Sequence, residues 1–277
     1  MACVIVGVAE TASPPLLALY DVVVSEADPM FASVIGAVGA NPLAASALAV
    51  LLRAADRRGT GEGLAAESAV YSTLQAGPEF AAWRAATPIH PRTGGDQPTV
   101  RVERDGSRLL VTLARPEMHN AFSVRMRDEL LEALGLAVAD DSVTEVVLAG
   151  DGSSFCSGGD LDEFGSRPDP TTAHAVRLAR SVGRVIASMS ERVTARIHGA
   201  CLGSGIELPA FAHRVIAHPE TRIALPEVSM GLIPGAGGTV SLPRRIGRHR
   251  TALLALSGAT IDAPTALRWG LIDSIEP

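Results

Sequence analysis

The chain has 277 residues, a formal net charge of −6 and no run of basic residues. This length can bury a sizeable core, as one large domain or as one domain with an appendage. The acidic balance argues against nucleic acid as the main partner. The three cysteines are too widely spaced for a metal motif, which favours a reducing, cytoplasmic compartment. No apolar run is long enough to span a bilayer, and the apolar start lacks the charges of a signal peptide, so no membrane partner is expected.

The first part of the chain is rich in alanine and predicts mostly helices. Asn41-Pro42 opens one helical pattern, and Leu64–Gln75 and Glu79–Ala86 repeat apolar residues at helical spacing. Thr87–Pro98 carries three prolines and two glycines without periodicity, which is typical of a linker. We therefore expect a helical N-terminal segment (residues 1–86), a linker (87–98) and a separate core (99–277).

Beyond the linker, strands and helices alternate with short connections, which predicts an α/β core. Asp105-Gly106 separates two apolar stretches and predicts a hairpin. Val143–Leu148 predicts a buried strand, and Thr171–Ser190 predicts one helix. A further helix is expected after the capping residue Ser123, with an apolar face of Met126, Leu130, Leu134 and Val138.

The most informative stretch reads I-H-G-A-C-L-G-S-G-I-E-L and ends with an acid, Glu207, just inside a predicted helix start. Its small residues, Gly203 and Ser204 among them, let backbone N–H groups approach a ligand, and a helix N-terminus favours developing negative charge. A second acid, Glu227, follows in A-L-P-E-V. A lone glutamate is more often a surface residue, but both acids here stand in apolar stretches. Two carboxylates and an anion-stabilising turn predict acid–base chemistry beside an oxyanion.

Two other glycine-rich stretches leave alternatives open. Phe155–Leu161 (F-C-S-G-G-D-L) predicts either a tight turn whose N–H groups reach a ligand or an ordinary turn with Asp160 as a helix N-cap. Gly231–Thr239 predicts a pocket wall or a structural loop. The histidines lack metal-ligand spacing, and the dinucleotide fingerprint of a nicotinamide dehydrogenase is absent.

Taken together, these stretches resemble the crotonase (enoyl-CoA hydratase/isomerase) superfamily. The resemblance implies a spiral core of repeated β-β-α turns, assembly into trimers or pairs of trimers, and an acyl-CoA thioester substrate in fatty acid metabolism, with no metal and no cofactor besides that coenzyme A. It also implies that the backbone N–H groups of Gly159 and Ser204 form an oxyanion hole. The matching segments are R-P-E-M-H-N-A-F, F-C-S-G-G-D-L, H-G-A-C-L-G-S-G-I-E-L, L-P-E-V-S-M-G-L-I-P-G-A-G-G-T, L-P-R-R-I-G and L-S-G-A-T-I-D-A-P-T-A-L-R-W-G-L-I-D. The positions that match the family's substrate- and CoA-contacting segments are His119, Asn120, Ala121, Ser157, Gly158, Asp160, Leu161 and Gly203.

Both glutamates of the family's hydratases have counterparts, Glu207 and Glu227. This favours addition of water to a 2-enoyl-CoA, giving a 3-hydroxyacyl-CoA. Two alternatives stay open: a double-bond isomerase, which needs only one acid, and a catalytically silent acyl-CoA-binding subunit. The discriminating observations are hydration of crotonyl-CoA, shift of a 3-enoyl-CoA, or tight binding without turnover.

The sequence also departs from the family pattern. Pro209 interrupts the helix that carries Glu207, and His213 replaces the usual aspartate at its end. The family's C-terminal helices have no counterpart after the core, whereas residues 41–86 look like that tail. Our hypothesis is a circular permutation in which the N-terminal segment covers the core; an unrelated helical appendage is the alternative.

Overall fold

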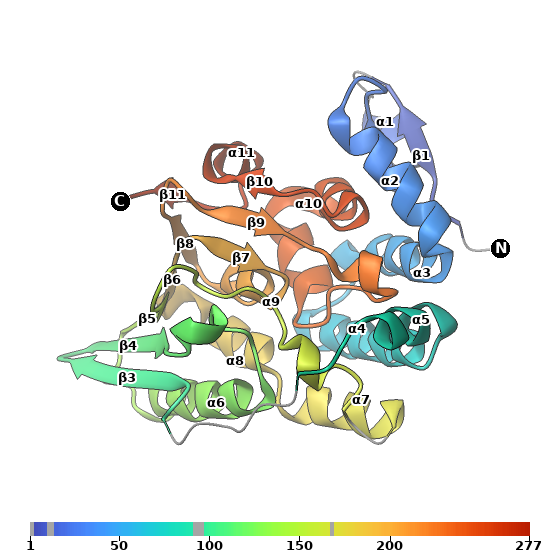
Figure 1. Cartoon of the computed structure of the whole chain (residues 1–277). Helices are drawn as coiled ribbons and strands as arrows, with labels where there is room; N and C mark the ends of the chain where they lie inside the picture. Colours follow the sequence, from blue (N-terminus) through green and yellow to red (C-terminus); the bar gives the residue numbers. More distant parts are fainter. Residues whose placement is uncertain (1–2, 10–13, 91–96, 167–168) are drawn as a thin grey trace.

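The computed structural model describes residues 3–9, 14–90, 97–166 and 169–277. Its largest sheet has the strand order β11-β8-β6-β5-β4-β3 (Figure 1). The β3–β4 pair is antiparallel and every other pairing in this sheet is parallel. The strands are β3 (Val100–Asp105), β4 (Arg108–Leu113), β5 (Glu145–Gly150), β6 (Val193–Ile197), β8 (Arg214–Ala217) and β11 (Ser274–Ile275).

The predicted hairpin is confirmed. Asp105 pairs with Arg108 at the end of the β3–β4 ladder, and Gly106 takes a positive φ of 57° in the turn. Apolar residues of β4 and β5 point into the core, where Val111 and Val146 are fully buried. The predicted strand Val143–Leu148 forms as β5, shifted by two residues.

A smaller sheet carries the glycine-rich turn that follows β7. Its order is β10-β9-β7, with strands β7 (Ala200–Leu202), β9 (Arg222–Ala224) and β10 (Ile261–Asp262). Two isolated bridges attach the loop around Gly159 to its neighbours: Cys156 pairs with Cys201 of β7, and Gly159 pairs with Phe122. The two glycine-rich stretches are therefore brought side by side.

Helix α6 (Val124–Ala139) begins at the predicted cap, because the Ser123 Oγ accepts a hydrogen bond from the Met126 N–H at 3.1 Å. Its predicted apolar face is partly wrong, because Val138 is 52% exposed and Ala137 is buried instead. At about 100° per residue, position 138 lies far around the helix from position 126, whereas position 137 lies almost directly in line with it.

The single helix predicted over Thr171–Ser190 is also wrong. It is divided into α7 (Pro170–Ala179), α8 (Val182–Ser188) and a 3₁₀ turn, η4 (Ser190–Arg192). Ser181 causes the break, since its side chain accepts from the Arg184 N–H and so caps a new helix.

The remaining core elements are short except for one kinked helix. Pro209 begins a 3₁₀ turn, so α9 is a single turn that ends on Glu207. The long helix α10 bends at Gly247, whose φ is 76° and ψ 160°. These elements are η2 (Pro116–Met118), η3 (Leu161–Glu163), α9 (Ser204–Glu207), η5 (Pro209–Phe211), η6 (Glu227–Met230), α10 (Gly238–Ser257) and α11 (Ala263–Trp269).

The N-terminal part contains helices, as expected, but also a parallel strand pair that the sequence did not predict. Its elements are β1 (Val6–Val8), α1 (Pro14–Leu17), β2 (Val22–Val24), α2 (Pro29–Ala40), α3 (Pro42–Leu52), η1 (Ala55–Arg57), α4 (Thr60–Gln75) and α5 (Pro78–Ala86). In the described residues, no single helix has the length and hydropathy to cross a membrane; α2 with Pro42–Arg57 passes that test only as a pair bent by 112°.

The N-terminal helices pack on the core at the side opposite the β3–β4 hairpin (Figure 1). Helices α2, α3 and α4 contact α10, and α4 also lies along α7. The approach is close at Gly63, where a Cβ would come within 2.8 Å of the Val240 side chain. The predicted linker Thr87–Pro98 lies largely outside the described residues, at 91–96.

Candidate active site

The two predicted acids meet across one glycine. Gly203 adopts φ 48° and ψ −119°, a backbone conformation that is open to glycine alone in practice. A Cβ at this position would lie 2.4 Å from the Glu227 Oε1 and 3.7 Å from the Glu207 Oε1. Both carboxylates therefore converge on the same few ångströms of space, although 20 residues separate them in the sequence.

Glu207 is held by a turn of the core. Its Oε2 accepts hydrogen bonds from the Ala236 and Gly238 N–H groups, both at 2.8 Å. The side chain is buried, and burial raises the pKa of Glu207 to about 7 against the opposing effect of those two amides. A carboxyl group with this pKa can accept or release a proton near neutral pH.

Glu227 lies at the start of η6, and its carboxyl group has fewer hydrogen-bond partners in the described residues than that of Glu207. The buried Oε2 of Glu227 has no hydrogen-bond partner among the described residues. Burial and the charges of Glu207 and Glu67 raise the pKa of Glu227 well above its usual value. This carboxyl group is therefore the natural proton donor of the pair, and its free oxygen is available to a ligand.

Gly159 and Ser204 line the same cavity as the acids. Neither backbone N–H donates a hydrogen bond within the described part of the chain. Phe122 fixes the position of Gly159 through two backbone hydrogen bonds. The Phe122 N–H donates to the Gly158 carbonyl, and the Phe122 carbonyl accepts from the Asp160 N–H. Two unpaired amides from separate loops are thus held in a cavity with two carboxyl groups.

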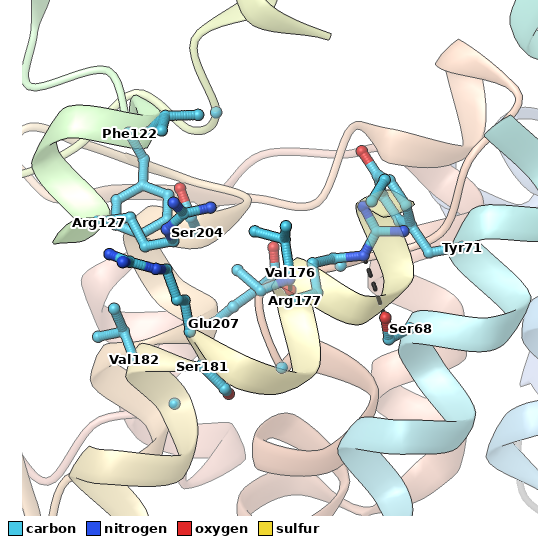
Figure 2. Close-up of a pocket in the computed structure, with 18 of the residues that line it drawn as sticks. Ser68, Tyr71, Phe122, Arg127, Val176, Arg177, Ser181, Val182, Ser204 and Glu207 are labelled. Carbon is cyan, nitrogen blue, oxygen red and sulfur yellow. Dashed lines mark hydrogen bonds between the residues drawn. The ribbon is translucent and has the colours of Figure 1, made fainter. Parts of the chain in front are cut away.

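The cavity has a volume of about 230 Å³ and lies where the core meets α4 (Figure 2). The core contributes the starts of α6 and α9 and both short helices α7 and α8. The N-terminal segment contributes one face of α4, with residues spaced about one turn apart: Leu64, Glu67, Ser68, Tyr71 and Gln75.

Glu67 is a third buried acid of this cavity that the sequence analysis missed. Its carboxylate accepts from the Gly237 N–H at 2.8 Å, the Thr239 N–H at 2.9 Å and the Thr239 Oγ1 at 2.7 Å. Burial and the Glu207 carboxylate raise the pKa of Glu67 to about 8. The available signal was its position three residues after Leu64, on the apolar face of α4, where an acid is unusual.

The other predicted contact residues divide into two groups. Besides the two acids, Gly159 and Ser204, only Asp160 of the predicted set lines the cavity. Asp160 pairs with Arg115 at 2.8 Å and also caps η3, as one of the two alternatives for this stretch predicted. A ligand contact of Asp160 stays a prediction. The residues that lie outside the cavity lining are His119, Asn120, Ala121, Ser157, Gly158, Leu161 and Gly203.

Asn120 illustrates why these residues lie apart from the cavity. It is fully buried, and its side-chain amide bonds only to backbone groups, namely the Arg115 N–H and the carbonyls of Asp151 and Ser154. Asn120 and His119 both take positive φ, near 50°. The Asn120 side chain therefore holds the loop shape, and a ligand contact in this segment stays a prediction.

Cys156 and Cys201 are buried, and burial raises the pKa of both thiols, so they act as small apolar residues. No group of three His, Cys, Asp or Glu residues in the described ranges has the geometry of a metal site.

The chain is similar to known proteins over its second part. The family model described as enoyl-CoA hydratase/isomerase matches residues 103–277. A 2,3-dehydroadipyl-CoA hydratase of Escherichia coli K12 is 32% identical over 64% of this chain and 68% of its own length. A peroxisomal bifunctional enzyme of Danio rerio is 36% identical over 60% of this chain, but the match spans only 22% of that enzyme. The crystal structure of an enoyl-CoA hydratase from Thermoplasma volcanium superposes with a TM-score of 0.60 at 34% identity, covering 65% of this chain and 72% of that one.

Fold and sequence therefore define an α/β protein with the crotonase fold. The chain belongs to the enoyl-CoA hydratase/isomerase family, as the predicted resemblance implied.

Proposed function

We propose that the protein hydrates a 2-enoyl-CoA thioester to a 3-hydroxyacyl-CoA. The observation that carries the proposal is the convergence of Glu207 and Glu227 across Gly203, in a cavity lined by the unpaired amides of Gly159 and Ser204. Names such as enoyl-CoA hydratase among similar proteins support the substrate class.

The mechanism assigns one proton transfer to each of the two acids. Glu207, whose pKa is about 7, accepts a proton from a water molecule while the water oxygen bonds to C3 of the substrate. The electrons of the C2=C3 bond move to the thioester oxygen, where the N–H groups of Gly159 and Ser204 stabilise the enolate. When the enolate collapses, Glu227 gives its proton to C2, since its raised pKa favours the protonated form. Each such amide contributes about 3–4 kcal/mol of barrier reduction in comparable sites.

The test is hydration of crotonyl-CoA by the wild type and by Glu207→Gln and Glu227→Gln. Each variant should lose about 10²–10⁴ in kcat, because each removes one proton-transfer group. Glu132→Gln on the exposed face of α6 is the matched control and should keep full turnover. A wild type that binds crotonyl-CoA without turning it over would identify a silent acyl-CoA-binding subunit instead.

Isomerisation is the second candidate, because the buried Oε2 of Glu227 has no hydrogen-bond partner among the described residues, whereas two amides hold the Oε2 of Glu207. A 3-enoyl-CoA substrate separates the two reactions. If Glu227→Gln abolishes both activities while Glu207→Gln abolishes only hydration, the site performs both. Conversion of the 3-enoyl-CoA without any hydration of crotonyl-CoA would contradict the hydratase assignment.

We further propose that the protein works in the cytoplasm as a homotrimer or a pair of trimers, with coenzyme A present only as part of the substrate. The wide spacing of the cysteines supports the compartment, and the assembly implied by the crotonase resemblance supports the trimer. Analytical ultracentrifugation of the full chain tests the trimer.

A further inference from the structure

Arg177 of α7 is a charged side chain inside the cavity whose purpose the hydration mechanism does not explain. Its Nε donates to the Ser68 Oγ at 3.1 Å, and its Nη2 donates to the Ser72 Oγ. The guanidinium lies over the Tyr71 ring, 4.6 Å from the ring centroid. Figure 2 shows Arg177 extending from α7 toward these residues of α4.

The guanidinium has no carboxylate partner among the described residues. Two other arginines that line this cavity do have a carboxylate partner: Arg127 and Arg180 both pair with Asp128, at 2.7 and 3.0 Å. Arg177 donates hydrogen bonds to neutral hydroxyls and lies over an aromatic face, and its Nη1 has no hydrogen-bond partner in the part of the chain that is described. The Glu67 carboxylate favours the charged form of Arg177 through space, without forming an ion pair. A partly buried cation with these partners is a strong binding site for an anion.

The surroundings fix the guanidinium in place. Because an arginine only donates, the Ser68 hydroxyl accepts from Arg177 and can direct its own proton to the His174 Nδ1, 2.8 Å away. Stacking on Tyr71 holds the plane of the guanidinium. A cation that is preorganised in this way loses little entropy when it binds a carboxylate in a bidentate manner.

Arg177 and Ser204 occupy different parts of one cavity. In Figure 2, Phe122 and Ser204 lie on one side, and Arg177 lies on the other side beside Ser68 and Tyr71. Apolar side chains, including Val176 of α7 and Phe164, line the same cavity. An acyl chain whose thioester carbonyl meets the Gly159 and Ser204 amides can extend along these apolar groups toward Arg177.

We propose that Arg177 binds a carboxylate at the far end of the acyl chain, so that the preferred substrate is an ω-carboxy-2-enoyl-CoA. This inference rests on the proposed function for the thioester end of the cavity and adds the recognition of the other end. An acyl chain that ends in a methyl group would leave the guanidinium without its anion.

The test compares binding of adipyl-CoA and hexanoyl-CoA, two unreactive thioesters with six-carbon chains that end in a carboxylate and a methyl group. By calorimetry, the wild type should bind adipyl-CoA about 10- to 100-fold more tightly, the range expected for a hydrogen bond to a charged group. Arg177→Met should lose this preference, and Arg177→Lys should keep part of it. Arg104→Gln is the matched control, because Arg104 lies on β3 outside the cavity lining and is paired with Asp140; it should keep the preference.

Succinyl- and suberyl-CoA, each against its methyl-ended counterpart, extend the same measurement to shorter and longer chains. Equal binding of every carboxylate-ended and methyl-ended pair by the wild type would overturn the proposal, as would a preference that survives in a folded Arg177→Met variant. Because the ligands are unreactive, the result is independent of turnover. If crotonyl-CoA is hydrated and no carboxylate preference exists, only the role of Arg177 fails; if no thioester binds and none is hydrated, the proposed function itself fails.

Discussion

The core and the N-terminal segment each hold the turn at Ala236–Thr239 with one buried acid, but they contribute different groups to the cavity. Along Ala236–Thr239, successive backbone N–H groups alternate between two buried acids. Those of residues 236 and 238 donate to Glu207 of the core, and those of residues 237 and 239 donate to Glu67 of the N-terminal segment. The comparison teaches that the cavity is shared: a segment outside the family match completes the wall of a cavity whose matched part carries the proposed catalytic acids.

The buried acids that the two regions contribute to the cavity differ in how completely their carboxyl groups are hydrogen-bonded. Glu67 accepts from three donors, whereas the Glu227 Oε2 has no partner in the described residues and the amides of Gly159 and Ser204 donate to nothing there. Unsatisfied buried groups are costly and are kept where a ligand completes them. We therefore expect substitutions in the core to abolish turnover and those in the N-terminal segment to act mainly on stability.

Removing the N-terminal segment altogether should have the largest effect. A fragment of residues 99–277 loses α4, whose Tyr71 ring would lie only 2.4 Å from a Cβ at Gly235, and exposes the buried Val240 of α10. We expect this fragment to be aggregated or inactive, as measured by light scattering and crotonyl-CoA hydration.

The control is the full chain with a protease site introduced between His90 and Gln97. Cutting there should leave activity intact, because packing rather than the covalent connection would hold the segment in place. A soluble fragment of residues 99–277 with full activity would make the N-terminal segment a separate appendage.

The next largest effect is expected from Gly203→Ala. The added Cβ meets the Glu227 Oε1 at 2.4 Å in a backbone conformation that alanine avoids. Displacing a reacting group by about 1 Å costs roughly 100-fold in rate, so kcat for hydration should fall by about that factor. Gly135→Ala is the matched control: a Cβ there meets nothing within 4 Å on a helix, and activity should be unchanged. Normal turnover by Gly203→Ala would mean that the two acids do not act together.

The two acids that converge at Gly203 could be picked out because their signals are local. Glu207 and Glu227 stand among apolar neighbours, and Gly203 must be a glycine for its backbone conformation. The hairpin at Asp105-Gly106 and the cap at Ser123 are local for the same reason. Each of these features depends on interactions within a few residues, which the sequence states directly.

The features that were missed depend on distant contacts. Glu67 bonds to residues 170 and 172 positions further along, and nothing in the segment around it specifies that turn. Arg177 lies in a region whose sequence carries no motif, and its role arises from α4 residues more than 100 positions earlier. The β1–β2 pair consists of three-residue strands, too short for a periodic pattern.

A smaller effect on turnover and a clear effect on stability are expected from Glu67→Gln. The pKa of Glu67 is raised from 4.5 to about 8, so the folded protein favours its protonated form. That contribution to stability is fully present below about pH 4.5 and is lost as pH rises through 8. The Tm of the wild type should therefore fall between pH 6 and pH 9, and glutamine, which mimics the neutral acid, should reduce this fall. Exposed Glu132→Gln should follow the wild type, and an unchanged Tm profile in Glu67→Gln would show that Glu67 is ionised throughout.

Asp21→Asn should change stability and leave turnover as it is, because Asp21 lies in the N-terminal segment away from the cavity lining. Its buried carboxylate accepts from the Arg53 Nε and Nη2 and from the Ile5 N–H, each at 2.8 Å. Burial raises the pKa of Asp21, but Arg53, the Ile5 amide and Arg248 lower it by more, so it lies below 3.8. The contribution of the Asp21 carboxylate to stability is therefore present above pH 3.8, and it is lost as the pH falls through the lower pKa that Asp21 has in the folded protein.

For this variant we expect a loss of about 1–3 kcal/mol in the free energy of unfolding at pH 7, measured by urea denaturation. The difference from the wild type should shrink toward pH 3, as the wild-type carboxyl group also becomes neutral. Arg108→Gln, which breaks an exposed ion pair with Glu145 at the core's edge, is the control and should cost much less than Asp21→Asn, because solvent screens exposed ion pairs. If Asp21→Asn lowered kcat as well as stability, the strand pair of the N-terminal segment would be coupled to the reacting acids through α10, and the division between a reacting core and a supporting segment would not hold.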